Sequence, residues 1–471
     1  MHNASRLRLG FAAVALAAAL LALLGATAQH VSANAGHVTP ALGANPRMHN
    51  EGAVADPTLQ VGPLRSCQKR QTPDPLGACY GPDQIRAAYG FTPLLNQGIT
   101  GAGRTIVIID AYGSNTISSD LGTFNAYFGL PSSPVNVILP DGTPSATTAS
   151  NAFGWKAETT LDVEWAHSIA PGATIDLVVA KSNDDADILS ATKYVADHNL
   201  GDVVSQSYGE AEQCMDSSLL SQQHVLFDRL AAEHITLLAS SGDQGAALPS
   251  CDGNSFIKAA STPATDPNVT AVGGTQLLAS PATANASGFV ANIGGTYQSE
   301  NAWNEGVGSS TGGGVSSVYS RPDYQAPVVK DTHMREVPDV AYNAAVNGGV
   351  LGALTCGPSE CGLPLATYFF RFGGTSAGSP QWAGLVALAD QMAGARIGGL
   401  NKTLYHFAQR SSASSLLHDV TVGDNSVPFD AGVPGTPITG FSAVTGYDEA
   451  TGWGSPIASV LVPALAKPGQ G

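Results

Sequence analysis

The sequence predicts an α/β fold in which a mainly parallel sheet is covered by helices on both faces. Apolar stretches that end in turn residues recur at 104–113, 173–180, 202–209 and 235–243. Helix-length segments lie between them, at 185–198 and 216–233. Strands that alternate with helices form parallel sheets, and the loops at the carboxyl ends of such strands form the functional site.

The first 28 residues have the pattern of a secretory signal peptide. Arg6 and Arg8 precede an apolar run from Phe11 to Leu24, and the small residues up to Ala28 supply a cleavage site. The run is short for a membrane span, and an uncleaved anchor is the alternative interpretation. No later segment is apolar enough to cross a bilayer, so we expect a secreted, extracellular protein without stable membrane association.

Two further regions differ in composition. Residues 29–78 are rich in Pro, Gly, Ala and Asn and lack periodicity, which indicates a linker or a short pro-segment. Residues 79–468 are expected to form one domain. Within it, Gly, Ser, Asn and Thr dominate residues 270–355, which predicts loops and short strands around the core. Small and apolar residues from Ser376 to Met392 predict a buried helix that starts at the serine.

The charge balance argues against nucleic acids and anionic membranes as partners. Acidic residues outnumber basic residues 37 to 21, and the formal net charge is −16. The sequence pI near 4.9 is compatible with an acidic working medium. Ordinary solubilising surface charge explains it equally well.

The six cysteines are expected to form disulfides, because the chain has an export signal and no spacing typical of a zinc site. Six cysteines allow 15 connectivities. Proximity along the chain favours the pairs Cys67 with Cys79, Cys214 with Cys251, and Cys356 with Cys361.

A candidate nucleophile lies in the stretch GGTSAGSPQWAG, residues 373–384. It places Ser376 at the start of a helix, where free backbone N–H groups can meet an oxyanion. A serine needs a base. None of the 11 histidines lies in the His-Gly-Thr context of a Ser-His-Asp enzyme, so the usual triad is not expected.

The candidate base is a pair of carboxyl groups on the helical segment 153–173. Glu158 and Asp162 are four residues apart and share one face. The same face carries Trp155, Trp165 and Ile169, whereas Lys156, Thr159, Glu164 and His167 point elsewhere. Acid pairs at this spacing are usually solvated surface, but the apolar stripe favours burial. Two buried carboxyls titrate as a unit with one raised pKa, and such a pair acts as a base at acid pH.

A third carboxyl, Asp243, follows a strand end in SSGDQGA, residues 240–246. It is either a turn-forming aspartate or a protonated acid that donates a hydrogen bond to a tetrahedral intermediate.

In this order, ETTLDVEWAHSIAPGA, SSGDQGA, TPATDPNVTAVGGT and GGTSAGSPQWAG resemble the sedolisins, the serine-carboxyl peptidases. The resemblance runs from Cys79 to residue 456. It implies a subtilisin-like fold, with Ser376 as nucleophile, Glu158 as base, Asp162 orienting it and sharing protons with it, and Asp243 as the oxyanion donor. Sedolisins usually carry a long folded pro-region, for which residues 29–78 are too short, so the control of activation is left open.

The resemblance also implies one calcium ion near the C-terminus. Its ligands would be the carboxylates of Asp419 and Asp448 and the backbone carbonyls of Val420, Val444 and Gly446, an oxygen set suited to calcium. Val444 stands where the family commonly has glycine. Two aspartates that cap turns are the alternative interpretation.

These observations together predict a secreted, monomeric serine peptidase that hydrolyses peptide or protein substrates at acid pH. Substrate is expected along residues 205–210 and 310–317, and Trp303 either lines a subsite or fills the core. The rival hypotheses are a catalytically silent secreted binding protein with the same fold and a neutral Ser-His-Asp peptidase.

Overall fold

The computed structural model describes residues 39–40, 48–54, 61–144, 149–306, 308–330, 332–409, 415–428 and 437–467. The predicted signal peptide, residues 1–28, lies outside this part of the chain.

The main sheet of the described residues has eight strands, and seven of them follow the order β16-β13-β9-β7-β4-β6-β5. Their bounds are β4 Thr105–Ala111, β5 Val135–Ile138, β6 Thr174–Ala180, β7 Val203–Gln206, β9 Thr236–Ser240, β13 Val269–Ala279 and β16 Tyr297–Ala302. The eighth strand, β19 (Val340–Asn343), pairs with β13. All pairs are parallel except that of β13 with β16. The predicted parallel sheet is therefore confirmed.

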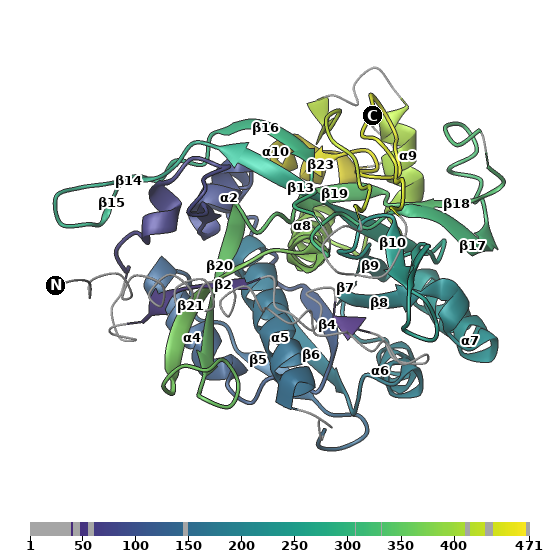
Figure 1. The fold of residues 1–471 in the computed structure, drawn as a ribbon, viewed down its shortest axis with the longest axis horizontal. Helices are drawn as coiled ribbons and strands as arrows, with labels where there is room; N and C mark the ends of the chain where they lie inside the picture. The colour runs from purple at the N-terminus through teal and green to yellow at the C-terminus, as the bar shows by residue number, and fades with distance from the viewer. Residues whose placement is uncertain are drawn as a thin grey trace, which may run out of the picture.

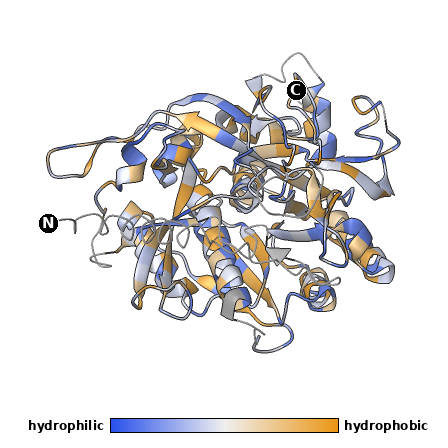
Figure 2. Ribbon diagram, in the orientation of Figure 1, coloured by the Kyte–Doolittle hydropathy of each residue, from blue (hydrophilic) through white to orange (hydrophobic). Residues whose placement is uncertain are grey.

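Helices cover both faces of this sheet (Figure 1). Along β4, Ile106 and Ile108 contribute to one buried cluster, whereas Val107 and Ile109 contribute to another. The first cluster includes residues of α4 (Ile117–Phe128), α5 (Ala149–Ile169) and α8 (Gly378–Ala393). The second includes residues of α6 (Asp185–Asp197) and α7 (Ser217–Ala232). Successive strand residues point to opposite faces, so both faces are apolar, and Figure 2 shows the hydrophobic colour along the central strands.

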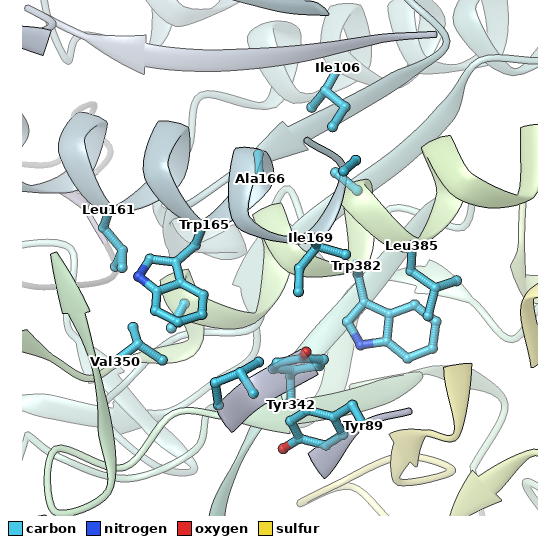
Figure 3. Close-up of a cluster of buried hydrophobic side chains, with 14 of the residues drawn as sticks. Tyr89, Ile106, Leu161, Trp165, Ala166, Ile169, Tyr342, Val350, Trp382 and Leu385 are labelled. Carbon is cyan, nitrogen blue, oxygen red and sulfur yellow. The ribbon is translucent and has the colours of Figure 1, made fainter. Parts of the chain in front are cut away.

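Helices α5 and α8 pack closely against each other and form the larger core. Trp165 of α5 and Trp382 of α8 are fully buried, and Figure 3 shows Trp165 beside Leu161 and Val350 and Trp382 beside Leu385, near the ring of Tyr342. A Cβ at Gly384 would lie 2.7 Å from Cβ of Ile169, so the helices approach where only glycine fits. Burying each large side chain contributes about 2 to 3 kcal/mol. This packing holds the start of α8 beside α5.

The second half of the chain is more regular than its composition predicts. Residues 270–355 were expected to be loops and short strands, but β13 is an 11-residue strand inside the main sheet. Gly273 and Gly274 interrupt its apolar pattern because a Cβ at either position would collide with Pro338 or Ala344. A second sheet has the order β2-β21-β20-β3. Its strands are β2 Met48–Ala53, β3 Cys79–Tyr80, β20 Gly349–Cys356 and β21 Ala366–Phe372.

Parts of the expected linker are paired with or packed into the domain. Strand β2 pairs antiparallel with β21, and Cys67, in the short helix η1 (Ser66–Lys69), is fully buried. Thr39–Pro40 forms β1, which pairs antiparallel with β8 (Tyr208–Ala211). Lack of local periodicity in residues 29–78 therefore does not mean lack of structure, because partners distant in sequence order parts of this segment.

All three predicted disulfides are present: Cys67–Cys79, Cys214–Cys251 and Cys356–Cys361. Within the described residues, no helix is both long enough and apolar enough to cross a membrane. The remaining helices are α2 Pro82–Ala88, α3 Thr92–Asn96, η2 Glu212–Cys214, η3 Thr375–Ala377, α9 Asn401–Ala408 and α10 Ala458–Leu465. The remaining strands are β10 Ala247–Pro249, β11 Phe256–Lys258, β12 Ser261–Thr262, β14 Thr283–Ala284, β15 Val290–Asn292, β17 Gly314–Ser320, β18 Met334–Val337, β22 Leu417–His418 and β23 Ser455–Pro456.

Candidate active site

The candidate site lies where the strand order of the main sheet changes direction. Strand β4 has β6, and beyond it β5, on one side and β7 on the other. Ligands of open α/β sheets bind outside the carboxyl ends of strands at such a point. Asp110 stands near the carboxyl end of β4, and Ser207 directly follows β7. Both are fully buried.

Helix α5 is buried on all sides rather than on one stripe. Glu158 and Asp162 have no exposed surface, as predicted, but Glu164 and His167 have none either. Partners across the helix compensate these polar groups. The backbone N–H of Ala353 donates to Glu164 (2.9 Å), and His167 Nε2 lies 2.9 Å from the carbonyl oxygen of Pro131. These two residues point away from the face of Glu158 and Asp162, as expected, but they are buried all the same, because strands and loops cover the sides of α5 that α8 leaves open.

Three carboxyl groups interact at the centre of the site. Burial raises the pKa of Asp162 well above its usual value, and the charges of Asp110 and Glu158 raise it further. Burial also raises the pKa of Asp110, to about 7. Ser207 Oγ donates a hydrogen bond to Oδ1 of Asp162 (2.9 Å), which opposes the shift. The cluster therefore retains protons at pH values where an ordinary carboxyl group has lost them.

Two aromatic rings accompany the carboxyl cluster. Trp155, one turn before Glu158 on α5, lies with its ring centroid 6.0 Å from that of Tyr208. Both residues are buried. Burial raises the pKa of Tyr208 well above its usual value, and the charges of Asp110 and Asp162 add to this, so the phenol stays neutral. The apolar rings keep the carboxyl groups poorly solvated.

Ser376 lies in η3, the short turn that leads into α8. Its side chain is fully buried, and its Oγ has no hydrogen-bond partner among the residues that the structure describes. Helix α5 contacts η3 directly, so the serine turn packs on the helix that carries Glu158 and Asp162. The expected helix start is confirmed with one difference: the first turn is a 3-10 turn.

Asp243 contacts the residues that precede Ser376. The backbone N–H and the hydroxyl of Thr375 donate to Asp243 Oδ1, at 2.7 and 2.8 Å. Gly374 has a φ of +111°, and a Cβ there would lie 2.5 Å from Asp243 Oδ2. Glycine therefore satisfies both the backbone conformation and the close approach of the carboxyl group. Asp243 therefore lies directly against the turn that carries Ser376.

The two segments expected to hold substrate border this site. Residues 205–210 include Ser207 and continue into β8, which pairs with both β1 and β12. Residues 310–317 begin beside Asp243, because the backbone N–H of Ser310 donates to the carbonyl oxygen of Asp243 (3.0 Å). Trp303 is fully buried and packs with Ala344 and Ala345. Of its two possible roles, the structure supports filling the core.

The predicted calcium ligands come together in one loop region. Gly446 N–H donates to Asp419 Oδ2 (3.0 Å), and Val444 N–H donates to Asp448 Oδ2 (2.9 Å). Burial raises the pKa of Asp448 to about 6, and a bound cation would offset the cost of that buried charge. No group of three or more His, Cys, Asp or Glu side chains that could hold a metal occurs in the described residues. The predicted set has only two such side chains, and its other donors are backbone carbonyls, so its chemistry fits calcium.

Comparisons with known proteins agree with this architecture. The model of the subtilase family matches residues 142–412. Kumamolisin from Bacillus sp. (strain MN-32) is 32% identical over 395 residues, which cover 82% of this chain and 63% of kumamolisin. Sedolisin from Pseudomonas sp. (strain 101) is 31% identical, over 76% of this chain and 57% of that protein. The chain belongs to the subtilase family, in its sedolisin branch.

A solved structure supports the same assignment. Pseudomonas sedolisin, a serine-carboxyl proteinase complexed with two molecules of pseudo-iodotyrostatin, superposes with a TM-score of 0.66 at 27% identity. The alignment covers 83% of this chain and 98% of the sedolisin chain. The subtilisin-like fold and the family resemblance predicted from the motifs are confirmed. The chain spans 63% or less of the length of the curated sedolisin relatives named above.

One member of the buried carboxyl cluster was not predicted from the sequence. Asp110 ends the stretch IVIID, which predicts a buried strand, and its carboxyl group was not identified as part of the site. The signal was available, because an acidic residue at the carboxyl end of a buried parallel strand points toward the site of such a fold.

Proposed function

We propose that this protein is a secreted serine-carboxyl peptidase that hydrolyses peptide bonds at acid pH through an acyl-enzyme on Ser376. The observation that supports this best is the packing of the serine turn on α5, which carries two buried carboxyl groups that interact with a third on β4. The similarity to kumamolisin and sedolisin supports the same proposal independently.

The first step transfers a proton from Ser376 Oγ to the carboxylate of Glu158 while Oγ attacks the substrate carbonyl carbon. The carbonyl oxygen becomes an oxyanion, and a protonated Asp243 donates a hydrogen bond to it together with backbone N–H groups of the serine turn. Collapse of the tetrahedral intermediate breaks the C–N bond, and Glu158 returns the proton to the leaving amine. Water then hydrolyses the acyl-enzyme by the same route in reverse.

The buried carboxyl cluster sets the working pH. One of its members must be ionised to act as a base while the others retain protons, and the raised pKa values allow both at once. A histidine would be protonated under these conditions. Burial lowers the pKa of His167, the histidine on α5, to about 4 and so favours its neutral form, but its Nε2 lies 2.9 Å from the carbonyl oxygen of Pro131 and is already engaged there. This arrangement favours the carboxyl mechanism over a Ser-His-Asp triad.

Substrate is proposed to lie as an extended strand along residues 205–210 and 310–317. The pairing of Thr39–Pro40 with Tyr208–Gly209 supports this, because a short extended segment of the chain itself lies antiparallel along β8. The substrates are proposed to be peptides or proteins, and the enzyme to act as a monomer.

One calcium ion is proposed to be held by Asp419, Val420, Val444, Gly446 and Asp448. When bound, it would supply a fixed positive charge that ties the loop around residue 446 to the segment at Asp419. Its role is to stabilise the fold, and no catalytic step involves it. Secretion is supported by the predicted signal peptide and by the three disulfides, which persist in oxidising compartments.

The decisive experiment is digestion of casein at about pH 3 to 5, a window taken from ordinary carboxyl pKa values. Ser376→Ala should lower the rate by at least about 10⁴-fold, and Glu158→Gln by about 10²-fold to 10⁴-fold. The matched control is Glu164→Gln, because Glu164 is also a buried carboxyl group on α5 but binds the backbone of Ala353. This control should retain activity.

Other outcomes would identify the rival hypotheses. A folded wild-type protein that cleaves nothing but binds peptides would be a catalytically silent binding protein. A rate optimum above pH 7, with Glu158→Gln fully active, would indicate a histidine-dependent peptidase.

A further inference from the structure

Glu212 occupies an unusual position at the end of β8. It is the first residue of η2, directly after the strand, and the residue is 1% exposed. The following disulfide, Cys214–Cys251, fixes the other end of η2. Among the described residues, Glu212 forms no salt bridge, and its Oε2 has no hydrogen-bond partner. A buried carboxyl group in this position is costly unless its contacts serve a purpose.

The other oxygen of Glu212 accepts hydrogen bonds from three consecutive residues of β17. The backbone N–H groups of Ser317 and Val318 donate to Oε1, at 2.6 and 2.7 Å. The hydroxyl groups of Ser316 and Ser317 also donate to it, at 2.7 and 3.2 Å. Hydrogen bonds to an ionised carboxylate are stronger than those between neutral groups.

These contacts replace pairing that β17 lacks at this point. The register between β17 and β18 shifts between Val315 and Ser320, so residues 316–319 stand opposite Arg335 alone and form a bulge-like irregularity, called the bulge below. A bulge leaves backbone groups unpaired and re-aims the chain, and bulges are common beside active sites. Here the carboxylate of Glu212 accepts from the amides in the bulge. It therefore helps to hold residues 316–318 beside the start of η2.

The opposite end of the same segment is fixed to the loop of Asp243. Ser310 N–H donates to the carbonyl oxygen of Asp243 (3.0 Å), and Gly312 N–H donates to that of Gly242 (2.7 Å). The segment 310–318 therefore runs from Asp243 to Glu212. Glu212 joins it to the end of β8, so the two proposed substrate-binding segments are tied together at this one carboxyl group.

We propose that Glu212 is a positioning residue that sets the separation of the two substrate-binding segments and thereby the affinity for extended peptides. The proposal rests on the proposed function, because it assigns substrate to these segments. Glu212 takes no part in proton transfer. Its effect acts through the backbone of β8 and of residues 316–318, so it concerns contacts made along an extended chain rather than at the bond that is cleaved.

The test uses peptides that are lengthened one residue at a time around the same cleavable bond. In the wild type, KM should fall with length. In Glu212→Gln, the KM of the longest peptide should rise at least about fivefold, because a neutral amide oxygen binds the amides of the bulge more weakly. The kcat and KM for the shortest peptide should not change. An equal loss at every length, or no change at any length, would overturn the proposal.

Two further variants keep the experiment decisive. Glu300→Gln is the matched control, since Glu300 is a buried carboxyl group whose hydrogen bonds within the described residues come from Thr275, Tyr89 and Ser455, all outside both segments. It should leave the length dependence intact. Should Glu212→Gln fail to fold, the double variant Ser316→Ala, Ser317→Ala removes the two hydroxyl donors and should weaken binding of long peptides in the same direction. A double variant with the wild-type length dependence would then refute the role of Glu212.

Binding measured without turnover separates this proposal from the proposed function. In a Ser376→Ala background, Glu212→Gln should raise the Kd of the longest peptide by a similar factor. If peptides bind with this dependence but the wild type cleaves none of them, the peptidase proposal fails and the role of Glu212 stands. If the wild type cleaves peptides but Glu212→Gln leaves both KM and Kd unchanged, the role of Glu212 fails alone.

Discussion

Ser207 donates a hydrogen bond from its hydroxyl group to Oδ1 of Asp162, at 2.9 Å. This bond joins the end of a central strand to the helix that carries the carboxyl pair, and both side chains are fully buried. The hydroxyl group of Ser207 is a neutral donor. Its acceptor, the carboxyl group of Asp162, is disfavoured in its ionised form by burial and by two neighbouring acids. The serine therefore tunes the protonation of the cluster without carrying a charge itself.

Ser207→Ala should move the acid limb of the pH–rate profile to higher pH. The hydrogen bond stabilises the ionised form of Asp162 and lowers its pKa, so its loss raises that pKa further. A profile of kcat/KM measured on one peptide would detect the shift. Ser205→Ala is the control, because Ser205 Oγ pairs with Ser379 Oγ (2.8 Å). An unchanged profile in Ser207→Ala would contradict the assignment of this limb to the cluster.

Asp110→Asn should flatten the pH dependence of stability. The pKa of Asp110 is raised by burial from an ordinary value near 3.8 to about 7, so the folded state binds a proton that the unfolded state has lost. Its contribution is complete below about pH 4 and disappears as the pH rises toward 7. The loss is of the order of a few kcal/mol. Thermal unfolding of the wild type should therefore occur at lower temperature at pH 7 than at pH 4.

The comparison with Asp110→Asn identifies the cause of that trend. The amide keeps the size of the side chain but cannot ionise, so Tm should fall less between pH 4 and pH 7. Asp120→Asn is a second variant for comparison. Asp120 is also buried with a raised pKa, but it lies on α4, outside the carboxyl cluster, and accepts hydrogen bonds from Thr116 and from Thr355 of β20. If Tm falls equally between pH 4 and pH 7 in the wild type and in Asp110→Asn, Asp110 is excluded as a source of the pH dependence of stability.

Gly374→Ala should remove most of the activity. The new Cβ would lie 2.5 Å from Asp243 Oδ2, and the φ of +111° is unfavourable for any side chain. Strain of this kind costs about 1 to 3 kcal/mol, and displacement of an oxyanion donor costs about 10²-fold to 10³-fold in kcat. Gly394→Ala separates the two effects, because Gly394 also has positive φ but no atom near the new Cβ. That variant should lose stability and keep kcat.

The sequence predicted the components of the site that depend on local spacing. Glu158 and Asp162 fall on one helical face by simple geometry, and Ser376 falls at a helix start. What covers the remaining faces of α5 could not be predicted. Lys156, for example, is buried beside Glu360, more than 200 residues away, with Nζ and Oε1 3.0 Å apart. A single sequence does not contain the identity of such distant partners.

The same limitation explains the two errors in the fold. Residues 48–53 show no strand periodicity in sequence. They form β2 because they pair with β21, which lies more than 300 residues later. Strand β13 was missed because Gly273 and Gly274 resemble a turn in sequence. The structure requires them to be small, since other parts of the chain press against the strand at these positions. In the sequence, two adjacent glycines indicate a flexible turn. In the structure, they are needed because no side chain fits at these positions.

Calcium should stabilise the protein through Asp419 and Asp448. At a free calcium concentration 100-fold above Kd, the gain is about 2.7 kcal/mol, and removal of the ion by a chelator should lower Tm correspondingly. Asp419→Asn should abolish the calcium-dependent part of Tm, since it removes one of only two carboxylates in the predicted set. Asp424→Asn is the control, because Asp424 Oδ1 accepts from the N–H of Ser426 in a neighbouring turn (2.8 Å), and it should keep the full response. A Tm that is unaffected by calcium in the wild type would show that these aspartates only hold the backbone of the loop at Val444 and Gly446 through the hydrogen bonds described above.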